Sequence, residues 1–176
     1  MRIRPVTHRD AEGIDKINAK VAEGRLFNFS TGKFEDVGQL IAGLTQFDHM
    51  FVLETETEPQ EICAVVLLQV NHQIFLRRMA TLRIIVDPKW QGQGLGKALM
   101  ASALDFADDE LMMERVEVEI PTDNVNALKL CKSAGFKVEG IAKDWMRSHE
   151  GHFVDAYLMA HCRNACLLYT SDAADD

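Results

Sequence analysis

The stretch 91–97, Gln-Gly-Gln-Gly-Leu-Gly-Lys, has the composition of an anion-binding loop. It follows an apolar, β-branched run that ends at Val86 and leads into a run typical of a helix. Alternate glycines permit positive φ and let backbone N–H groups approach a ligand closely. The first N–H groups of a helix have no intrahelical partner, and the helix dipole favours an anion beside them. Together with the charge of Lys97, the stretch predicts a site for a phosphate-bearing ligand.

Two other phosphate-binding motifs do not fit this stretch. A P-loop requires Ser or Thr after its lysine, but Ala98 follows Lys97. The dinucleotide fingerprint requires G-x-G-x-x-G after the first strand of a βαβ unit, whereas Gly92, Gly94 and Gly96 form G-x-G-x-G in mid-chain. The remaining alternatives are a phosphate site of another kind and a tight strand–helix turn that binds nothing.

The glycine stretch resembles one family pattern closely. Residues 91–96 are similar to the [RQ]-x-x-G-x-[GA] signature of the GNAT superfamily of acyl-CoA N-acyltransferases, and residues 84–90 resemble the strand before it. The resemblance covers nearly all of 1–164 and implies acetyl-CoA as the acyl donor, without a metal. It also implies that backbone amides of the stretch hold the pyrophosphate of coenzyme A, while the strand pairs its main chain with the pantetheine arm. The cofactor-binding residues assigned in this way are Ile84, Ile85, Val86, Gln91, Gly92, Gln93, Gly94, Leu95, Gly96, Lys97 and, from the next block, Asn124.

A second block, residues 124–136, resembles the family pattern N-x-x-A-x-x-L-Y-x-x-x-G-F. The resemblance implies that Asn124 hydrogen-bonds the cofactor. Cys131 stands where the family usually has a tyrosine that protonates the departing thiolate. A free thiol with a pKa of about 8.5 can donate a proton, so Cys131 is a candidate catalytic residue. The alternatives are that Cys131 is a small buried apolar side chain, or that it accepts the acyl group covalently.

The candidate general base comes from the strand-like run 115–120. An amine must be neutral to attack a thioester, so a nearby group must accept its proton. In this run Glu117 and Glu119 share the face opposite to the apolar side chains. Glu119 lies five residues before Asn124, where some GNAT relatives carry a catalytic glutamate, and it is therefore our candidate. The alternative is a solvated acidic face that pairs with arginines.

The closing segment resembles the end of a GNAT subgroup that acetylates amino acids or ribosomal-protein N-termini. Residues 25–29 and 144–149 would flank the amine-acceptor site in that layout, or would complete the core. The six histidines show no metal-ligand spacing, and two of them, His149 and His152, are expected either near the acceptor or in a surface loop. The positions that match the subgroup are Gly140, Gly151, Asp155 and Met159.

Apolar periodicity predicts the elements that position these groups. Alternating or continuous apolar runs predict strands at 2–6, 49–54, 61–70, 80–87, 115–120, 136–144 and 152–160. Helical spacing predicts helices at 7–24, 35–47, 97–111 and 124–135. Strands that alternate with helices and hairpins indicate a mixed α/β sheet. With the resemblance, the expected fold is a mixed, mostly antiparallel central sheet flanked by helices, with a splayed strand pair.

Composition places the chain among ordinary globular proteins. With 47% hydrophobic and 26% charged residues among 176, the composition argues against extensive disorder. A net charge of −8 argues against a nucleic-acid partner held by a basic surface. Scattered cysteines, no signal-peptide core and no membrane-length apolar run predict a reduced, cytoplasmic protein without membrane contact. We expect one domain over 1–164. Residues 165–176 break the preceding patterns and resemble a translated sequencing adaptor, so a non-native or disordered tail is expected there.

Two functions from different classes stay open at this point. The first is an acetyl-CoA-dependent N-acetyltransferase that moves an acetyl group directly to a primary amine of an amino acid, a small molecule or a peptide N-terminus. The second is a non-catalytic acyl-CoA-binding or sensing module, which the missing tyrosine favours. Net acidity favours a cationic acceptor through electrostatic steering. The sequence identifies neither the acceptor nor the oligomeric state, although homodimers are common in the family.

Overall fold

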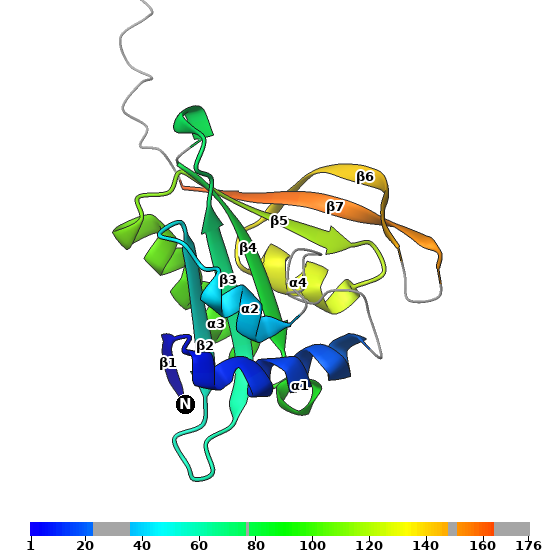
Figure 1. The fold of residues 1–176 in the computed structure, drawn as a ribbon. Helices are drawn as coiled ribbons and strands as arrows, with labels where there is room; N and C mark the ends of the chain where they lie inside the picture. Colours follow the sequence, from blue (N-terminus) through cyan, green and yellow to red (C-terminus); the bar gives the residue numbers. More distant parts are fainter. Residues whose placement is uncertain (23–35, 77, 148–150, 164–176) are drawn as a thin grey trace, which may run out of the picture.

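A seven-stranded sheet forms the centre of the protein, seen in a computed structural model that describes residues 1–22, 36–76, 78–147 and 151–163 (Figure 1). The strand order is β1-β2-β3-β4-β5-β7-β6, and every neighbouring pair is antiparallel except β4–β5. The strands are β1 (Arg2–Pro5), β2 (Asp48–Glu54), β3 (Ile62–Val70), β4 (Met79–Val86), β5 (Arg115–Pro121), β6 (Lys137–Arg147) and β7 (Phe153–Cys162).

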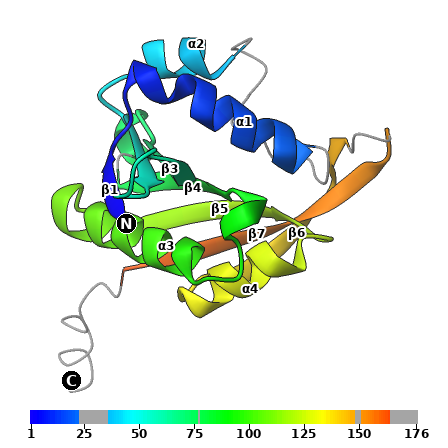
Figure 2. The same cartoon turned by 90° about the horizontal axis from the view of Figure 1, so that it is seen from below.

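Helices cover both faces of this sheet. Figure 2 shows α1 and α2 on one face and α3 and α4 on the other. The α-helices are α1 (Ala11–Ala22), α2 (Val37–Ala42), α3 (Leu95–Asp105) and α4 (Val125–Ser133). The shorter helical turns are η1 (His8–Asp10), η2 (Ile74–Leu76), η3 (Pro88–Trp90) and the π-helical η4 (Phe106–Glu110).

Side-chain alternation along the strands divides the core into two apolar layers. Beneath α1 and α2, Ile14 and Ile17 pack with strand residues such as Ile85. On the other face, α3 contributes Met100 and α4 contributes Cys131 to a layer that includes alternate side chains of the same strands. The run 62–70 is apolar without interruption because β3 is covered on both faces.

The expected order of strands and helices, and the mixed, mostly antiparallel sheet, are confirmed. Two helix boundaries differ from the prediction. Helix α2 ends at Ala42 rather than near 47, because Gly43 caps it and the amide and hydroxyl of Thr45 donate to Asp48 at 2.9 and 2.7 Å, which turns the chain into β2. Helix α3 begins at Leu95, two residues before the predicted start, and its last predicted turn is π-helical.

The parallel pair β4–β5 separates soon after it begins. Its register joins Met79–Thr81 to Arg115–Glu117, yet β4 continues to Val86 and β5 to Pro121. Strand β4 stays paired with β3 as far as Val86 on its other side. The two strands diverge visibly in Figure 1, and the splayed pair expected from the sequence is confirmed. We call the side of β4 that no longer pairs with β5 its open edge.

Several sequence predictions fall on residues that the structure does not describe. They concern the segment 25–29, His149 and the tail 165–176, so the domain boundary near 164 stays a prediction. Of the described helices, none combines the length and the apolar composition that crossing a bilayer requires.

Candidate active site

The main chain of β4 faces the open edge at alternate residues. The amide of Asp87 donates to the carbonyl of Cys63 at 2.9 Å, which fixes the phase of the antiparallel β3–β4 ladder. By that alternation the N–H and C=O groups of Ile84 and Val86 point to the open edge, whereas those of Ile85 face β3. The side chain of Ile85 is buried beneath α1. Of the three strand residues predicted to pair with a cofactor, Ile84 and Val86 therefore present the required groups.

The glycine loop, residues 91–96, connects η3 with the first turn of α3. Gly92 and Gly94 have φ values of 75° and 80°, a left-handed conformation that glycine adopts readily. Apart from chain neighbours, no atom of a described residue lies within 4 Å of a Cβ built on either glycine, so the described structure leaves this side of the loop open. The first intrahelical bond of α3 joins the amide of Ala98 to the carbonyl of Gly94 at 3.0 Å. The amides of residues 95–97 therefore point out of the helix end and form a cradle of donors for an anion.

Gly96 brings this anion cradle against the open edge. A Cβ at Gly96 would lie 3.3 Å from Cγ2 of Val86 and 3.4 Å from Cδ2 of Leu130, so its absence allows α3, β4 and α4 to meet closely. The Nε2 of Gln91 donates to the carbonyl of Val86 at 3.0 Å and ties the loop to the strand. The predicted loop residues and the predicted strand residues thus belong to one site, with Gln93 and Lys97 exposed at its rim.

Helix α4 contributes Asn124 and Cys131. The Oδ1 of Asn124 caps the helix by accepting a hydrogen bond from the amide of Ala127 at 3.1 Å, which leaves its side-chain NH₂ group to donate to a ligand. Cys131 is 1% exposed in the apolar layer beneath α3 and α4. Burial raises the pKa of its thiol to about 12. A buried thiol that is so weakly acidic favours the packing role of Cys131 over proton donation.

Glu119 lies on the opposite face of the sheet from α4. Its neighbours Val118 and Ile120 belong to the layer beneath α3 and α4, so alternation turns Glu119 toward the side of α1. Glu119 is half-buried, and within the described ranges its carboxylate has no hydrogen bond or ion pair. Glu117, in contrast, accepts a hydrogen bond from Nε of Arg115 at 2.5 Å. Glu117 therefore fits the arginine-paired acidic face that the sequence left open as an alternative. The Glu119 carboxylate is unpaired among the described residues.

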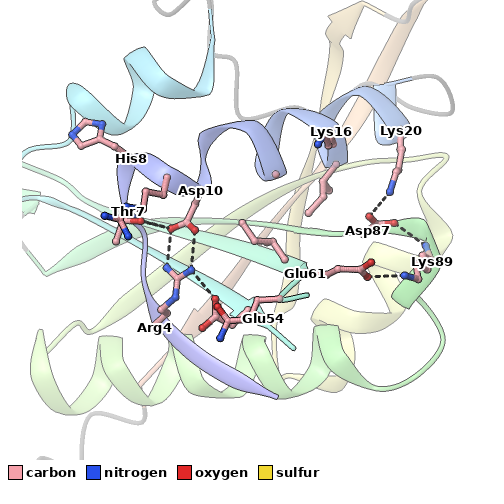
Figure 3. Close-up of a pocket in the computed structure, with 15 residues that line it drawn as sticks. Arg4, Thr7, His8, Asp10, Lys16, Lys20, Glu54, Glu61, Asp87 and Lys89 are labelled. Carbon is pink, nitrogen blue, oxygen red and sulfur yellow. Dashed lines mark hydrogen bonds and ion pairs between the residues drawn. The ribbon is translucent and has the colours of Figure 1, made fainter. Parts of the chain in front are cut away.

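A charged groove of about 900 Å³ runs along α1 and is lined also by β1, β3 and η3 (Figure 3). Several of its charges are paired with one another: Arg4 donates to Asp10 at 2.8 Å and to Glu54 at 2.6 Å. Lys20 of α1 donates at 2.6 Å to Asp87, whose carboxylate also caps η3. The groove contains none of the residues predicted for chemistry, but its Lys20–Asp87 pair links α1 to the turn before the glycine loop. Sequence reasoning missed this link, although an aspartate directly before Pro88 is a recognisable capping signal.

Comparisons with known proteins point to one family. The model of the acetyltransferase (GNAT) family matches residues 20–136. An L-amino acid N-acetyltransferase of Escherichia coli (strain K12) is 35% identical over 85 residues, which are 48% of this chain and 52% of that protein. A spermidine N(1)-acetyltransferase of the same strain is 30% identical over 95 residues, which are 54% of this chain and 48% of that protein. The chain thus spans about half the length of these curated relatives.

A solved structure with the same fold covers almost the whole chain. A ribosomal-protein-alanine N-acetyltransferase from Brucella melitensis superposes with a TM-score of 0.79 over 93% of this chain and 100% of that chain, at 19% sequence identity. At this identity the likeness shows the fold alone, including the order of strands and helices described above.

Proposed function

The chain belongs to the acetyltransferase (GNAT) family, and from that premise we propose that it is an acetyl-CoA-dependent enzyme that acetylates a primary amine. One observation carries the proposal: the anion cradle of the glycine loop adjoins the open edge of β4. The cradle suits a pyrophosphate, and an open strand edge suits an extended arm that contains amides. Coenzyme A carries both groups in one molecule, whereas a site for phosphate alone would have no use for the strand edge.

In the proposed complex each part of the site has a separate binding role. The amides of residues 95–97, together with Gly92 and Gly94, hold the pyrophosphate. The outward-facing main-chain groups of Ile84 and Val86 bond the pantetheine arm. The side-chain NH₂ of Asn124 adds a donor from α4. These groups belong to three elements that Gly96 allows to meet, so the loop, the strand and the helix act as one binding surface.

Bound acetyl-CoA supplies an activated thioester, and residues of the chain assist the transfer. Glu119 accepts the proton of the acceptor amine, directly or through one water, so that a neutral nitrogen attacks the carbonyl carbon. An outward-facing N–H of β4 near Val86, one that the pantetheine arm does not use, donates to the carbonyl oxygen as negative charge develops there. The new C–N bond forms and the C–S bond breaks, and the second proton that the nitrogen loses passes through water to the departing thiolate. In this proposal Cys131 neither supplies that proton nor carries the acyl group, which its burial and raised pKa support.

The acceptor in this proposal is a primary amine. The relatives and the solved structure above are named for L-amino acids, spermidine and a ribosomal-protein alanine, which supports an amine acceptor without choosing among the three. The net charge of −8 favours a cationic amine. We further propose a cytoplasmic protein, which the scattered cysteines support.

Thiol release from acetyl-CoA tests the proposed function. The 176-residue chain is mixed with acetyl-CoA and, separately, spermidine, L-methionine or trialanine, with a chromogenic thiol reagent and mass spectrometry as readouts. A reaction without amine corrects for the four cysteines of the chain. We expect thiol release that depends on one class of amine and equals the N-acetylated product formed. If acetyl-CoA raises the unfolding temperature but no amine is acetylated, the non-catalytic acyl-CoA-binding alternative is favoured. If acetyl-CoA does not bind, the proposal is refuted.

A further inference from the structure

The side-chain amide of Asn18, in α1, has no hydrogen-bond partner for its oxygen. Asn18 is 9% exposed, and its Oδ1 accepts no hydrogen bond from any described residue. A buried acceptor that is left unpaired destabilises the folded state, and native proteins keep few of them. A leucine of similar size would fill the same space without that cost. The presence of the amide therefore indicates a role other than packing.

The position of Asn18 on α1 shows where its amide points. Ile14 and Ile17 pack on the sheet, while Asp15 accepts a hydrogen bond from the amide of Val37 at the start of α2, at 3.4 Å. Asn18 comes four residues after Ile14 and three after Asp15, so its side chain lies between the sheet-facing and α2-facing sides of the helix. Asn18 is also about one turn nearer than Ile14 and Asp15 to the C-terminal end of α1. Its amide therefore points into the angle between α1 and the sheet, just beyond the start of α2.

That angle adjoins the splayed part of the sheet. The same end of α1 is fixed to the end of β4 by the ion pair between Lys20 and Asp87. Figure 2 shows α1 crossing above β4 toward the far ends of β5 and β7. Glu119 turns its carboxylate to this same face from β5. Two oxygen acceptors, Oδ1 of Asn18 and the carboxylate of Glu119, thus share one face, and neither has a donor among the described residues.

We propose that Asn18 is a positioning and specificity-determining residue for the acceptor amine. Its Oδ1 accepts a hydrogen bond from an N–H of the acceptor, and this contact orients the nitrogen that Glu119 deprotonates. The inference rests on the proposed function. It explains why an unpaired amide persists at this position: the donor that it lacks is supplied by the acceptor amine.

Two substitutions at Asn18 and one control on the same helix test this role. Asn18→Leu removes the acceptor oxygen, Asn18→Asp keeps one, and Glu12→Leu alters an exposed residue of α1. KM is measured for acetyl-CoA and for spermidine, L-methionine and trialanine, together with the unfolding temperature. We expect Asn18→Leu to raise KM for the amine by about ten-fold or more, the size of one lost hydrogen bond, with KM for acetyl-CoA unchanged and the unfolding temperature the same or higher. We expect Asn18→Asp to bind the amine nearly as the wild type does, and Glu12→Leu to match the wild type throughout.

Three results would overturn the inference while leaving the proposed function in place. One is an active wild type whose Asn18→Leu variant has an unchanged KM for the amine. Another is an Asn18→Asp variant that loses amine binding as fully as Asn18→Leu. The third is a parallel loss of both substrates in Asn18→Leu with a lower unfolding temperature, which indicates a structural role. A wild type that acetylates none of the amines refutes the proposed function and this inference with it.

Discussion

Replacement of Cys131 by alanine tests how the departing thiolate is protonated. Burial raises the pKa of Cys131 to about 12, whereas an ordinary thiol such as that of coenzyme A has a pKa of about 8.5. Proton transfer from Cys131 to the thiolate would then be uphill by about 3.5 pKa units, or about 5 kcal/mol. A general acid typically raises a rate about 10²–10⁴-fold. The cost of the uphill proton transfer would cancel an acceleration of that size. We therefore expect kcat of Cys131→Ala to stay within about two-fold of wild type.

The same substitution does affect stability. Cys131 belongs to the apolar layer that also contains Leu99, Met100 and Phe136, so removal of the sulfur leaves a small cavity there. A loss of this size costs about 1 kcal/mol of unfolding free energy, or roughly 2–4 °C in unfolding temperature for a chain of this length. Cys162→Ala is the matched control, because Cys162 is exposed and neither property should change.

Steady-state kinetics at saturating acetyl-CoA and amine, with thermal unfolding of each variant, checks both expectations. A fall in kcat of about 100-fold or more in Cys131→Ala, at a stability loss of only a few degrees, would refute the reasoning. That result would mean that Cys131 reaches the thiolate during turnover and takes the place of the usual tyrosine.

Three further predictions concern the loop, the base and an ion pair. Gly94→Ala should raise KM for acetyl-CoA about ten-fold, because alanine at a φ of 80° is strained by about 1–2 kcal/mol and displaces the amide cradle. The control is Gly140→Ala, at a glycine without positive φ, which should leave KM for acetyl-CoA unchanged. Glu119→Gln should lower kcat about 10²–10⁴-fold without lowering the unfolding temperature, and an unchanged kcat would exclude Glu119 as the base. Asp10→Asn should cost about 3 kcal/mol in urea unfolding at pH 7, because it breaks a buried pair with Arg4. Burial alone would raise the pKa of Asp10, but hydrogen bonds from Arg4 and a backbone amide hold it below its ordinary value. The stabilisation is therefore present above the unfolded-state pKa of about 3.9. The difference in unfolding free energy between Asp10→Asn and wild type should shrink as the pH falls below that value. A difference that stays constant with pH would contradict the pairing.

The parts of the fold that the sequence predicts correctly depend on neighbours close in the chain. The uninterrupted apolar run 62–70 indicates a strand covered on both faces, and β3 is such a strand. The glycines at 92 and 94 indicate positive φ, and both have it. Such signals are visible without any knowledge of tertiary contacts. Helix α2 shows the limit, because its end depends on hydrogen bonds between Thr45 and Asp48 that helical periodicity does not include.

The parts of the site that the sequence leaves open depend on pairing with distant residues. Which of Ile84, Ile85 and Val86 presents its main chain to the open edge follows from the phase of the β3–β4 ladder. Whether Cys131 is an accessible acid or a packed side chain follows from how α3 and α4 cover it. A polar residue at 18, within the apolar pattern of α1, is visible in the sequence, but its lack of a partner is visible only in the folded chain.

In the proposed complex, the two faces of the sheet recognise the two substrates by different means. On the side of α3 and α4, recognition uses backbone amides and glycine conformations. These fix the residue type at few positions other than Gly92, Gly94 and Gly96. This explains how the loop can be found from a short motif. On the side of α1, recognition uses individual side chains, here Asn18 and Glu119, and such side chains can change while the fold stays the same. Relatives that share the fold are accordingly named for different amines. We therefore expect substitutions on the α1 side to change which amine is used, while acetyl-CoA binding is preserved.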